Sequence, residues 1–450
     1  MNIKLLTQIR DKRDRRHLFH IAGSFFFRGG SVLISFLSVR YAVGILLPQE
    51  YGVWLTIYSV ASWIFLLDGG LGNGLKNKLT QVIIENNYSK GKKLVSTAYI
   101  SIGLLMAAIL LLVIISSLWI EYGSFFNVEL SMYKDTALCF LIVLVCVAVK
   151  FIFDLINSVF LAFQKAALVH LVNFLSSLLT YLCLVLFFSF FEDYKLVLFG
   201  LIMTGIPLLF YLITNVYFFS TSYKQLKPSF KSFEKKYLSD LLSLGVKFFI
   251  IQFSVLIIFS SDNFIITQLF GAEAVTSYNI SYKLYSVFTV IWTIILTPYW
   301  TAFTEAYHKQ EFDWIIKTVK RLEKAWLVLV LGVIIVTLIC NYIYLLWLGE
   351  KVKVDYKISI SMALFIIITT LTNIYVYVIN GVGKIKLQLI TSVIIGLLNI
   401  PLSIFFAKNL GLGVSGVMYA TCFCIGVTPI VNYIQYKKIV TKKDIGIWGK

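Results

Sequence analysis

Several ionisable side chains lie inside long apolar runs of this 450-residue sequence. The basic ones are Arg28, Arg40, Lys150 and Lys283. A charge within such a run is costly unless it faces a partner or a water-filled cavity, so these residues mark candidate binding sites. An excess of bases predicts a cavity with a positive field, and a desolvated anion is its natural ligand. Arginine suits phosphate especially well, because a guanidinium can donate two parallel hydrogen bonds to it.

Two acidic residues within the apolar runs are candidates for binding a proton or Na⁺. These are Asp154 and Asp262. Burial raises the pKa of a carboxylate and a nearby lysine lowers it, so a lysine that moves can switch proton affinity. Structural roles stay open: Lys150 and Asp154 are spaced i, i+4 and could neutralise each other. Asp262 and Lys283 lie at similar depth on consecutive predicted helices and could form a buried ion pair.

Arg40 is the strongest candidate for anion recognition, because its own apolar run contains no acid. Glu50 lies beyond the outer end of that run. A distant acid or backbone carbonyl groups could still satisfy the guanidinium. Arg28 has a closer candidate partner, Asp68, near the same end of the first predicted hairpin.

A polar face in the tenth apolar run adds Asn373 to the candidate substrate-binding residues. Its neighbours on this run are Thr369, Thr370, Thr372, Tyr377 and Asn380. Amides and hydroxyls at this density could bind sugar hydroxyls. They could equally form hydrogen bonds between helices, which is their commoner use in membranes.

Other site chemistries find little support. The glycine-rich stretch 69–74 lacks the Gly-Lys-Ser/Thr of a phosphate-binding loop, and an apolar run rather than a strand precedes it. Its glycines suit a helix end better than a helix interior. The six cysteines lie inside apolar runs without zinc-ligand spacing, so neither a metal site nor a disulfide framework is indicated. No catalytic motif is present, and we expect neither an enzyme nor a cofactor.

Composition places these residues in a membrane protein. Hydrophobic residues make up 59% of the chain and charged residues only 14%. Apolar runs of about 20 residues fit transmembrane helices and exclude the short alternating strands of a barrel. We therefore predict an all-α polytopic membrane protein. The twelve expected spans are 21–47, 53–68, 95–118, 136–162, 168–190, 195–219, 246–270, 277–301, 326–348, 358–380, 387–407 and 414–434.

The longest polar segment within the chain divides these spans into two sets of six. The predicted organisation is an N-terminal lobe (1–222), a cytoplasmic connecting segment (223–245) and a C-terminal lobe with a cytoplasmic tail (246–450). Two six-helix lobes begin on the same side of the membrane, as parallel repeats around a central cavity would. Weak internal sequence similarity supports a repeat. The first span is followed by Pro48-Gln49-Glu50-Tyr51-Gly52, and the seventh is followed by Gly271-Ala272-Glu273-Ala274-Val275.

Basic residues are distributed very unevenly between the two sides of these spans. With the N-terminus inside, the inner segments hold 30 Lys and Arg and the outer segments hold 6. The positive-inside rule then predicts that both termini are cytoplasmic. The net charge of +18 lies along the anionic inner leaflet, so membrane lipids rather than nucleic acid are the expected partners.

Three segments carry a resemblance to a known family. They are Arg40-Tyr41 through Pro48-Gln49-Glu50-Tyr51-Gly52, then Leu67-Asp68-Gly69-Gly70-Leu71-Gly72-Asn73-Gly74-Leu75-Lys76-Asn77-Lys78-Leu79, then Lys92-Lys93-Leu94-Val95-Ser96-Thr97-Ala98-Tyr99. The sequence resembles the bacterial O-antigen flippases, which belong to the polysaccharide transporter family of the multidrug/oligosaccharidyl-lipid/polysaccharide exporter superfamily. The likeness is most specific over residues 40–99 and extends along the chain in span count and topology.

The resemblance implies a multi-pass protein of the bacterial inner membrane that moves an undecaprenyl-diphosphate-linked oligosaccharide between leaflets. It implies alternating access between two lobes, coupled to an H⁺ or Na⁺ gradient, with a polysaccharide polymerase as a possible partner. Two alternatives stay open. A drug/cation antiporter of the same superfamily would favour an acidic cavity, and a membrane-embedded polymerase or ligase would need a larger outer loop.

Overall fold

The apolar runs fold into helices. The computed structural model describes residues 23, 26–68, 70–163, 165–187, 195–239 and 261–449, and no β-strand occurs among them. Helices cover residues 26–45 and 261–270. The N-terminal half also contains α2 (Pro48–Ser62), α3 (Leu71–Ile84), α4 (Tyr88–Ser116), α5 (Tyr122–Phe125), α6 (Tyr133–Ala162), α7 (Ala166–Phe187) and α8 (Lys195–Ser220). The C-terminal half contains α10 (Ala272–His308), α11 (Phe312–Leu348), α12 (Tyr356–Val382), α13 (Lys386–Ile404), α14 (Gly413–Ile425) and α15 (Thr428–Val440).

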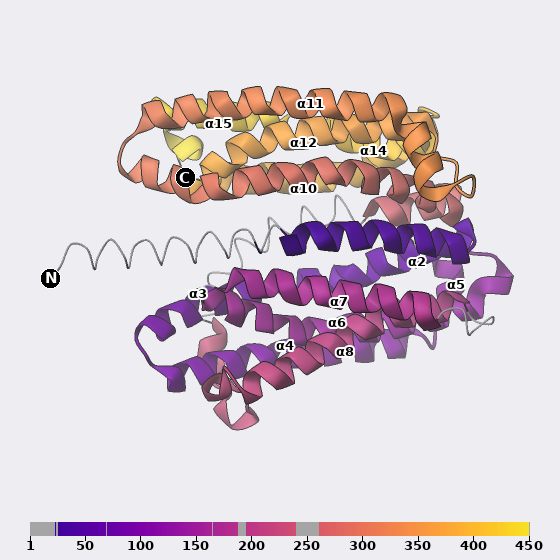
Figure 1. Ribbon diagram of the computed structural model, residues 1–450, viewed down its shortest axis with the longest axis horizontal. Helices are drawn as coiled ribbons and strands as arrows, with labels where there is room; N and C mark the ends of the chain where they lie inside the picture. Colours follow the sequence, from indigo (N-terminus) through magenta and orange to yellow (C-terminus); the bar gives the residue numbers. More distant parts are fainter. Residues whose placement is uncertain are drawn as a thin grey trace. The chain divides into compact units, whose positions relative to one another are not determined.

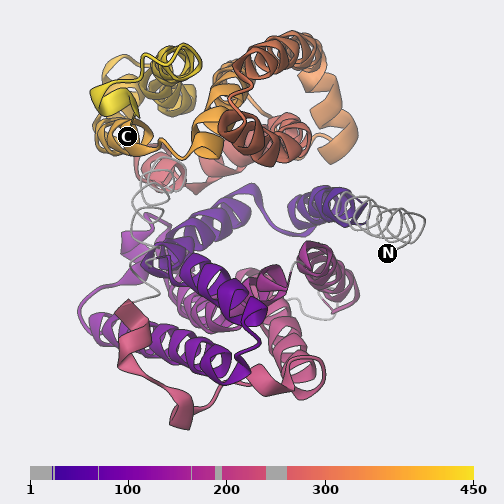
Figure 2. The ribbon, with the colours of Figure 1, turned by 90° about the vertical axis from the view of Figure 1, so that its left-hand side faces the viewer.

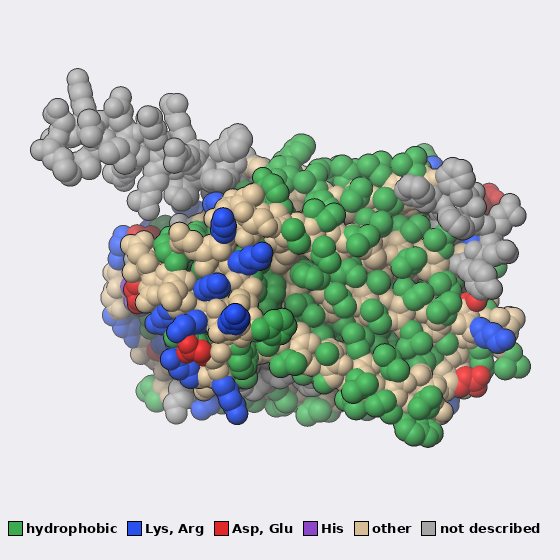
Figure 3. Space-filling view, turned by 90° about the horizontal axis from the view of Figure 1, so that it is seen from below, with side chains coloured by type: hydrophobic (Ala, Val, Ile, Leu, Met, Phe, Trp, Pro, Cys, Tyr) green, Lys and Arg blue, Asp and Glu red, His purple; other side chains and the backbone are tan. Residues whose placement is uncertain are grey.

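Within the described ranges, nine helical segments are long and apolar enough to cross a membrane. Their apolar side chains are largely exposed: only 17% of the most apolar window of α11 is buried, and Val328 and Leu338 are 71% and 70% exposed. Figure 3 shows one face on which hydrophobic side chains cover the middle while Lys and Arg gather at one end. An apolar surface of this extent is stable only in lipid. The chain is an all-helical, multi-pass membrane protein, as predicted.

Most predicted spans coincide with these helices, although the last is divided. Residues 413–440 form α14 and α15, which are separated by a break at Gly426 and Val427. The predicted seventh span (246–270) is described only from residue 261, so its earlier part lies outside the described residues.

The glycine-rich stretch differs from the expectation that its glycines avoid a helix interior. Gly70 has φ +82° and precedes α3, but Gly72 and Gly74 lie inside the first turns of that helix. Leu71, Leu75 and other apolar residues of α3 are buried, and the helix packs against α4 and α6. Burial of this kind outweighs a helix propensity cost of about 1 kcal/mol per glycine. Part of the predicted cytoplasmic loop is therefore a packed helix.

The described helices belong to two compact units. The first comprises residues 1–41, 64–125 and 129–249, and the second comprises residues 42–63, 126–128 and 250–450. Within each unit the long helices run side by side. Figure 1 views them from the side, and Figure 2 views the same helices after a turn of 90°. In the first unit α6 packs against α8, and in the second α10 packs against α12. The lobe boundaries inferred from the sequence stay a prediction.

The short segment Pro48–Gly52 docks α2 onto α10 within the second unit. Glu50 Oε2 accepts a hydrogen bond of 2.8 Å from the Leu47 backbone N–H at the start of α2, and Thr276 Oγ1 donates one of 2.6 Å to the Pro48 carbonyl. A Cβ atom on Gly52 would lie 1.7 Å from the Ala272 carbonyl oxygen, so this position requires glycine. The motif that carried the resemblance is thus a close-packing device between two helices.

Candidate functional site

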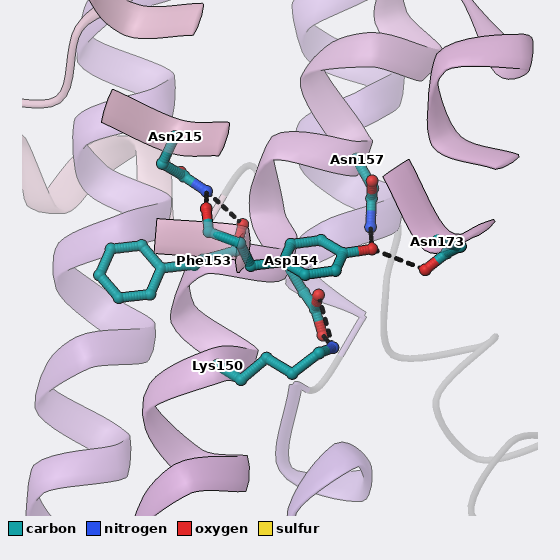
Figure 4. Close-up of polar contacts among 7 residues, drawn as sticks. Lys150, Phe153, Asp154, Asn157, Asn173 and Asn215 are labelled. Atoms are coloured by element: carbon teal, nitrogen blue, oxygen red, sulfur yellow. Dashed lines mark hydrogen bonds and ion pairs between the residues drawn. The ribbon is translucent and has the colours of Figure 1, made fainter. Parts of the chain in front are cut away.

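The first unit holds a half-buried polar cluster centred on α6. The predicted i, i+4 pair is formed: Lys150 Nζ lies 2.7 Å from Asp154 Oδ2 and 2.9 Å from Oδ1. Figure 4 shows the two side chains facing each other along the helix. About a fifth of each side chain is exposed, 23% and 22%. The Lys150 ammonium also lies 4.4 Å from the centre of the Tyr211 ring, a cation–π distance.

Asparagines and tyrosines from four helices surround this ion pair. Tyr211 OH donates to Asn173 Oδ1 on α7 at 2.7 Å and accepts a hydrogen bond from Asn157 on α6 at 3.2 Å (Figure 4). Asn215 Nδ2 donates to the Phe153 carbonyl at 2.9 Å and to the Tyr211 carbonyl at 2.8 Å. Its Oδ1 accepts from Tyr99 on α4 at 2.6 Å. The network connects α4, α6, α7 and α8 around one ionisable pair.

A second polar cluster lies in the second unit, around Asp262. This residue is 1% exposed, and its Oδ2 accepts a 2.5 Å hydrogen bond from Tyr278 OH on α10. Asp262 Oδ1 has no hydrogen-bond partner among the described residues. Beside it, Asn263 Nδ2 donates to Ser59 on α2 at 2.6 Å, and its Oδ1 accepts from Asn279 at 2.7 Å.

The ion pair considered between Asp262 and Lys283 is not formed among the described residues. The partner of the carboxylate is a tyrosine hydroxyl on the same neighbouring helix. Residues 278 and 283 are five apart on α10, so they project from different faces of that helix. Similar predicted depth on consecutive helices is therefore not sufficient to make these two side chains meet.

Both arginines of the first helix are free of acidic partners in the described part of the chain. Arg40 is exposed and Arg28 is half-buried, and neither forms a hydrogen bond or ion pair with the described residues. The Asp68 side chain lies outside the described residues, so its pairing with Arg28 stays a prediction. A guanidinium in an apolar helix without an internal acid is available to an external anion or to water.

The polar face of α12 is used mainly for packing between helices. Thr370 accepts a hydrogen bond from Trp326 Nε1 at 3.1 Å, and its carbonyl accepts one from Trp292 Nε1 at 2.8 Å. Thr372 Oγ1 lies 3.1 Å from Thr428 Oγ1 on α15. The half-buried Asn373 shares this helix, and its role in binding substrate stays a prediction.

The sequence interpretation missed the tyrosines and asparagines that complete both clusters. Helical spacing in the sequence could have identified them. Asn157 follows Asp154 by three residues and shares its face, and Asn215 follows Tyr211 by four. Their partners come from other helices, and no local pattern identifies those. No group of three or more His, Cys, Asp or Glu gathers within the described ranges.

Comparison of the sequence with known proteins identifies the family to which it is similar. The sequence model of a family described as polysaccharide biosynthesis protein matches residues 21–303. A putative O-antigen export protein of Yersinia pseudotuberculosis is 24% identical over 316 residues, covering 68% of this chain and 69% of that protein. A putative O-antigen transporter of Salmonella typhi is 22% identical over the same lengths.

Solved structures share the fold over most of the chain. An inward-facing multidrug resistance MATE family transporter of the MOP superfamily superposes with a TM-score of 0.77 at 14% identity, covering 92% of this chain and 95% of the other. An outward-facing MATE family transporter gives a TM-score of 0.65 at 15% identity, covering 95% of both chains. At these identities the likeness establishes the fold alone.

Proposed function

Because this chain belongs to the polysaccharide biosynthesis protein family, we propose that it is a flippase for lipid-linked oligosaccharides. Its substrate would be an undecaprenyl-diphosphate-linked O-antigen or polysaccharide repeat unit, moved from the inner to the outer leaflet of the bacterial inner membrane. Transport would proceed by alternating access, driven by an H⁺ or Na⁺ gradient. The relatives named as O-antigen exporters and the MATE-like fold support a transporter, and both termini would be cytoplasmic.

Arg40 is the residue that we propose binds the diphosphate of the substrate. It is a permanent cation within an apolar helix, and the described residues offer it no counter-charge. A diphosphate bears two or more negative charges and presents oxygens at the spacing that a guanidinium recognises. Arg28 lies three to four turns away on the same helix, and Lys150 is already paired with Asp154. Arg40, to which the described residues offer no counter-charge, is therefore better placed for anion recognition than Lys150.

The Asp262 cluster supports ion coupling. The carboxylate is buried, it has one tyrosine partner, and one of its oxygens has none in the described residues. Such a group can exchange a proton or accept a cation more readily than a carboxylate that is fully paired with a lysine. Asp154 is the second candidate, and its lysine partner could release it during the cycle.

The test of function is where the lipid-linked oligosaccharide accumulates when the gene is deleted. Loss of a flippase traps single repeat units on the cytoplasmic face, where a membrane-impermeant oxidant added to spheroplasts cannot reach them. Loss of a polymerase leaves accessible single units, and loss of a ligase leaves accessible polymer. Accessible intermediates would contradict the proposal.

Complementation of the deletion with variants tests the role of Arg40. Arg40→Ala should abolish surface glycan while the protein still accumulates in the membrane. Arg40→Lys should retain partial activity, because it keeps the charge and loses the two-point hydrogen bonding. Lys134→Ala, which removes an exposed lysine at the start of α6, is the matched control and should retain full activity. Full activity of Arg40→Ala would place the anion elsewhere.

A further inference from the structure

A pocket of about 590 Å³ lies in the first unit at the end of α8. It is formed where α8, the turn between α6 and α7, the start of α4 and the short helix η4 (Lys224–Leu226) meet. None of the lining residues is acidic. They are Tyr88, Phe163, Thr221, Ser222, Tyr223, Lys224, Gln225 and Leu226.

Tyr223 contributes a buried hydrogen-bond donor without a partner. The residue is 4% exposed, yet its hydroxyl forms no hydrogen bond within the described part of the chain. Aromatic packing fixes the ring, whose centre lies 4.7 Å from that of Phe163 and 6.0 Å from that of Phe218. Burial raises the pKa of Tyr223 to about 12, so the hydroxyl keeps its proton at neutral pH. A bound acceptor would satisfy this donor, which burial has removed from water.

Positive charge is concentrated at the same place. Lys165 Nζ lies 5.4 Å from the centre of the Tyr223 ring, and Lys224 lines the pocket itself. Two ammonium groups and a phenol hydroxyl form a donor set for a phosphate group. Ser222 and Gln225 add further polar atoms to the wall.

An apolar surface leads along α8 towards this pocket. Leu209, Ile213, Val216 and Tyr217 are 54%, 63%, 60% and 60% exposed, and α8 ends at Ser220 beside the lining residues. A ligand with a phosphate head and a long apolar tail would fit both features. A small soluble anion would occupy only the pocket and would leave the apolar surface of α8 unused.

We propose that this pocket binds the phosphate headgroup of an anionic glycerophospholipid, whose acyl chains lie along the exposed face of α8. The juxtaposition of an unpartnered buried hydroxyl, two lysines and an apolar helix face carries the assignment. The bound lipid would be a tightly held neighbour of the protein rather than the molecule it transports, so the site is independent of the proposed function.

Native mass spectrometry of the delipidated full chain in detergent tests the site. The probes are phosphatidylglycerol and phosphatidylethanolamine with identical acyl chains. The wild type should retain phosphatidylglycerol about 10-fold better, because the ammonium group of phosphatidylethanolamine would be repelled by the two lysines while phosphatidylglycerol carries only the phosphate charge. Lys165→Gln combined with Lys224→Gln should abolish that preference. Tyr223→Phe, which keeps the ring packing, should weaken retention several-fold.

A matched control separates the pocket from general surface charge. Lys231→Gln combined with Lys235→Gln removes the same charge from two exposed lysines that do not line the pocket, and it should leave retention unchanged. Equal losses in the two double variants would overturn the proposal. Displacement of the lipid by equimolar inorganic phosphate would also overturn it, because the pocket would then be a site for free anions.

Discussion

Lys150 and Asp154 show how a membrane helix accommodates two charges at once. They are one turn apart on α6, in contact at 2.7 Å, and each retains some exposure. Removing one partner of a buried ion pair leaves an uncompensated charge that costs more than the pair is worth. This pair is therefore either a fixed structural element or one that separates only when another charge replaces a partner. Asp262 differs, because its hydrogen-bond partner is an uncharged tyrosine.

The two aspartates can be distinguished by substitution with asparagine. Asp262→Asn keeps an acceptor for Tyr278 but cannot bind a proton, so we expect transport to fall and to lose its response to a collapsed proton gradient. Asp154→Asn should lower the thermal unfolding midpoint as well as transport, because Lys150 loses its counter-charge. The measurements are surface glycan with and without a protonophore, and unfolding of the purified protein.

Glu305→Gln is the control for the Asp154 substitution. It breaks another i, i+4 ion pair, formed by Glu305 and Lys309. The two side chains of that pair are 66% and 57% exposed, respectively. Exposed pairs contribute little to stability, so no measurable change is expected. Unchanged transport in both aspartate variants would show that neither carboxylate couples to the ion gradient.

At the scale of elements, Gly52 sets how closely α2 approaches α10. Gly52→Ala places a methyl group against the Ala272 carbonyl, where neither backbone can move freely. We expect a loss of about 1–3 kcal/mol in the free energy of unfolding, as for other overpacked contacts. The thermal unfolding midpoint in detergent measures it.

Gly44→Ala is a matched control for this substitution. A Cβ atom added to Gly44, which lies in the preceding helix, would meet no neighbouring atom within 4 Å. This change should be neutral or stabilising by about 0.5–1 kcal/mol, since alanine favours helix. Equal effects of the two substitutions would show that the close approach at Gly52 does not limit stability.

The connecting segment after α8 is anchored to α4 through Glu234. Its carboxylate lies 2.6 Å from Lys93 Nζ and 2.9 Å from Lys236 Nζ, and its backbone N–H donates to Thr97 Oγ1 at 3.2 Å. Hydrogen bonds from Lys236 and Lys93 lower the pKa of Glu234 from its ordinary value of 4.5. A lowered carboxylate pKa means that the anchor is fully present above pH 4.5 and is lost as pH falls through the lowered pKa.

A spin label at Lys231→Cys reports this anchoring. Its mobility should stay constant from neutral pH down to 4.5 and then rise as Glu234 is protonated. With Glu234→Gln added, the label should be mobile throughout, with no step. A step that persists in that variant would assign the pH response to another group.

At the scale of the whole molecule, orientation in the membrane rests on the 30-to-6 distribution of basic residues. In a cysteine-free background, single cysteines at Ser124 and Lys231 occupy exposed positions in a predicted outer loop and in the cytoplasmic connecting segment. A membrane-impermeant maleimide should modify Ser124→Cys in intact spheroplasts and Lys231→Cys only after lysis. The reverse pattern would invert the topology.

The sequence by itself determined the class of protein and the place of most helices. Apolar runs such as those of α4 and α11 can be satisfied only in lipid, and hydropathy is a local property that needs no knowledge of the fold. The contact between Lys150 and Asp154 was also predictable, because helix geometry alone brings residues four apart together.

Only the tertiary structure decided which helices meet and which residues pair across them. Asp262 is bonded to Tyr278 rather than to Lys283 because the rotation of α10 selects one of its faces. Gly72 and Gly74 are helical because α4 and α6 bury the apolar side of α3, and residues 42–63 join the second unit because Gly52 lets α2 approach α10. These outcomes depend on packing between segments far apart in the chain, which no local pattern encodes.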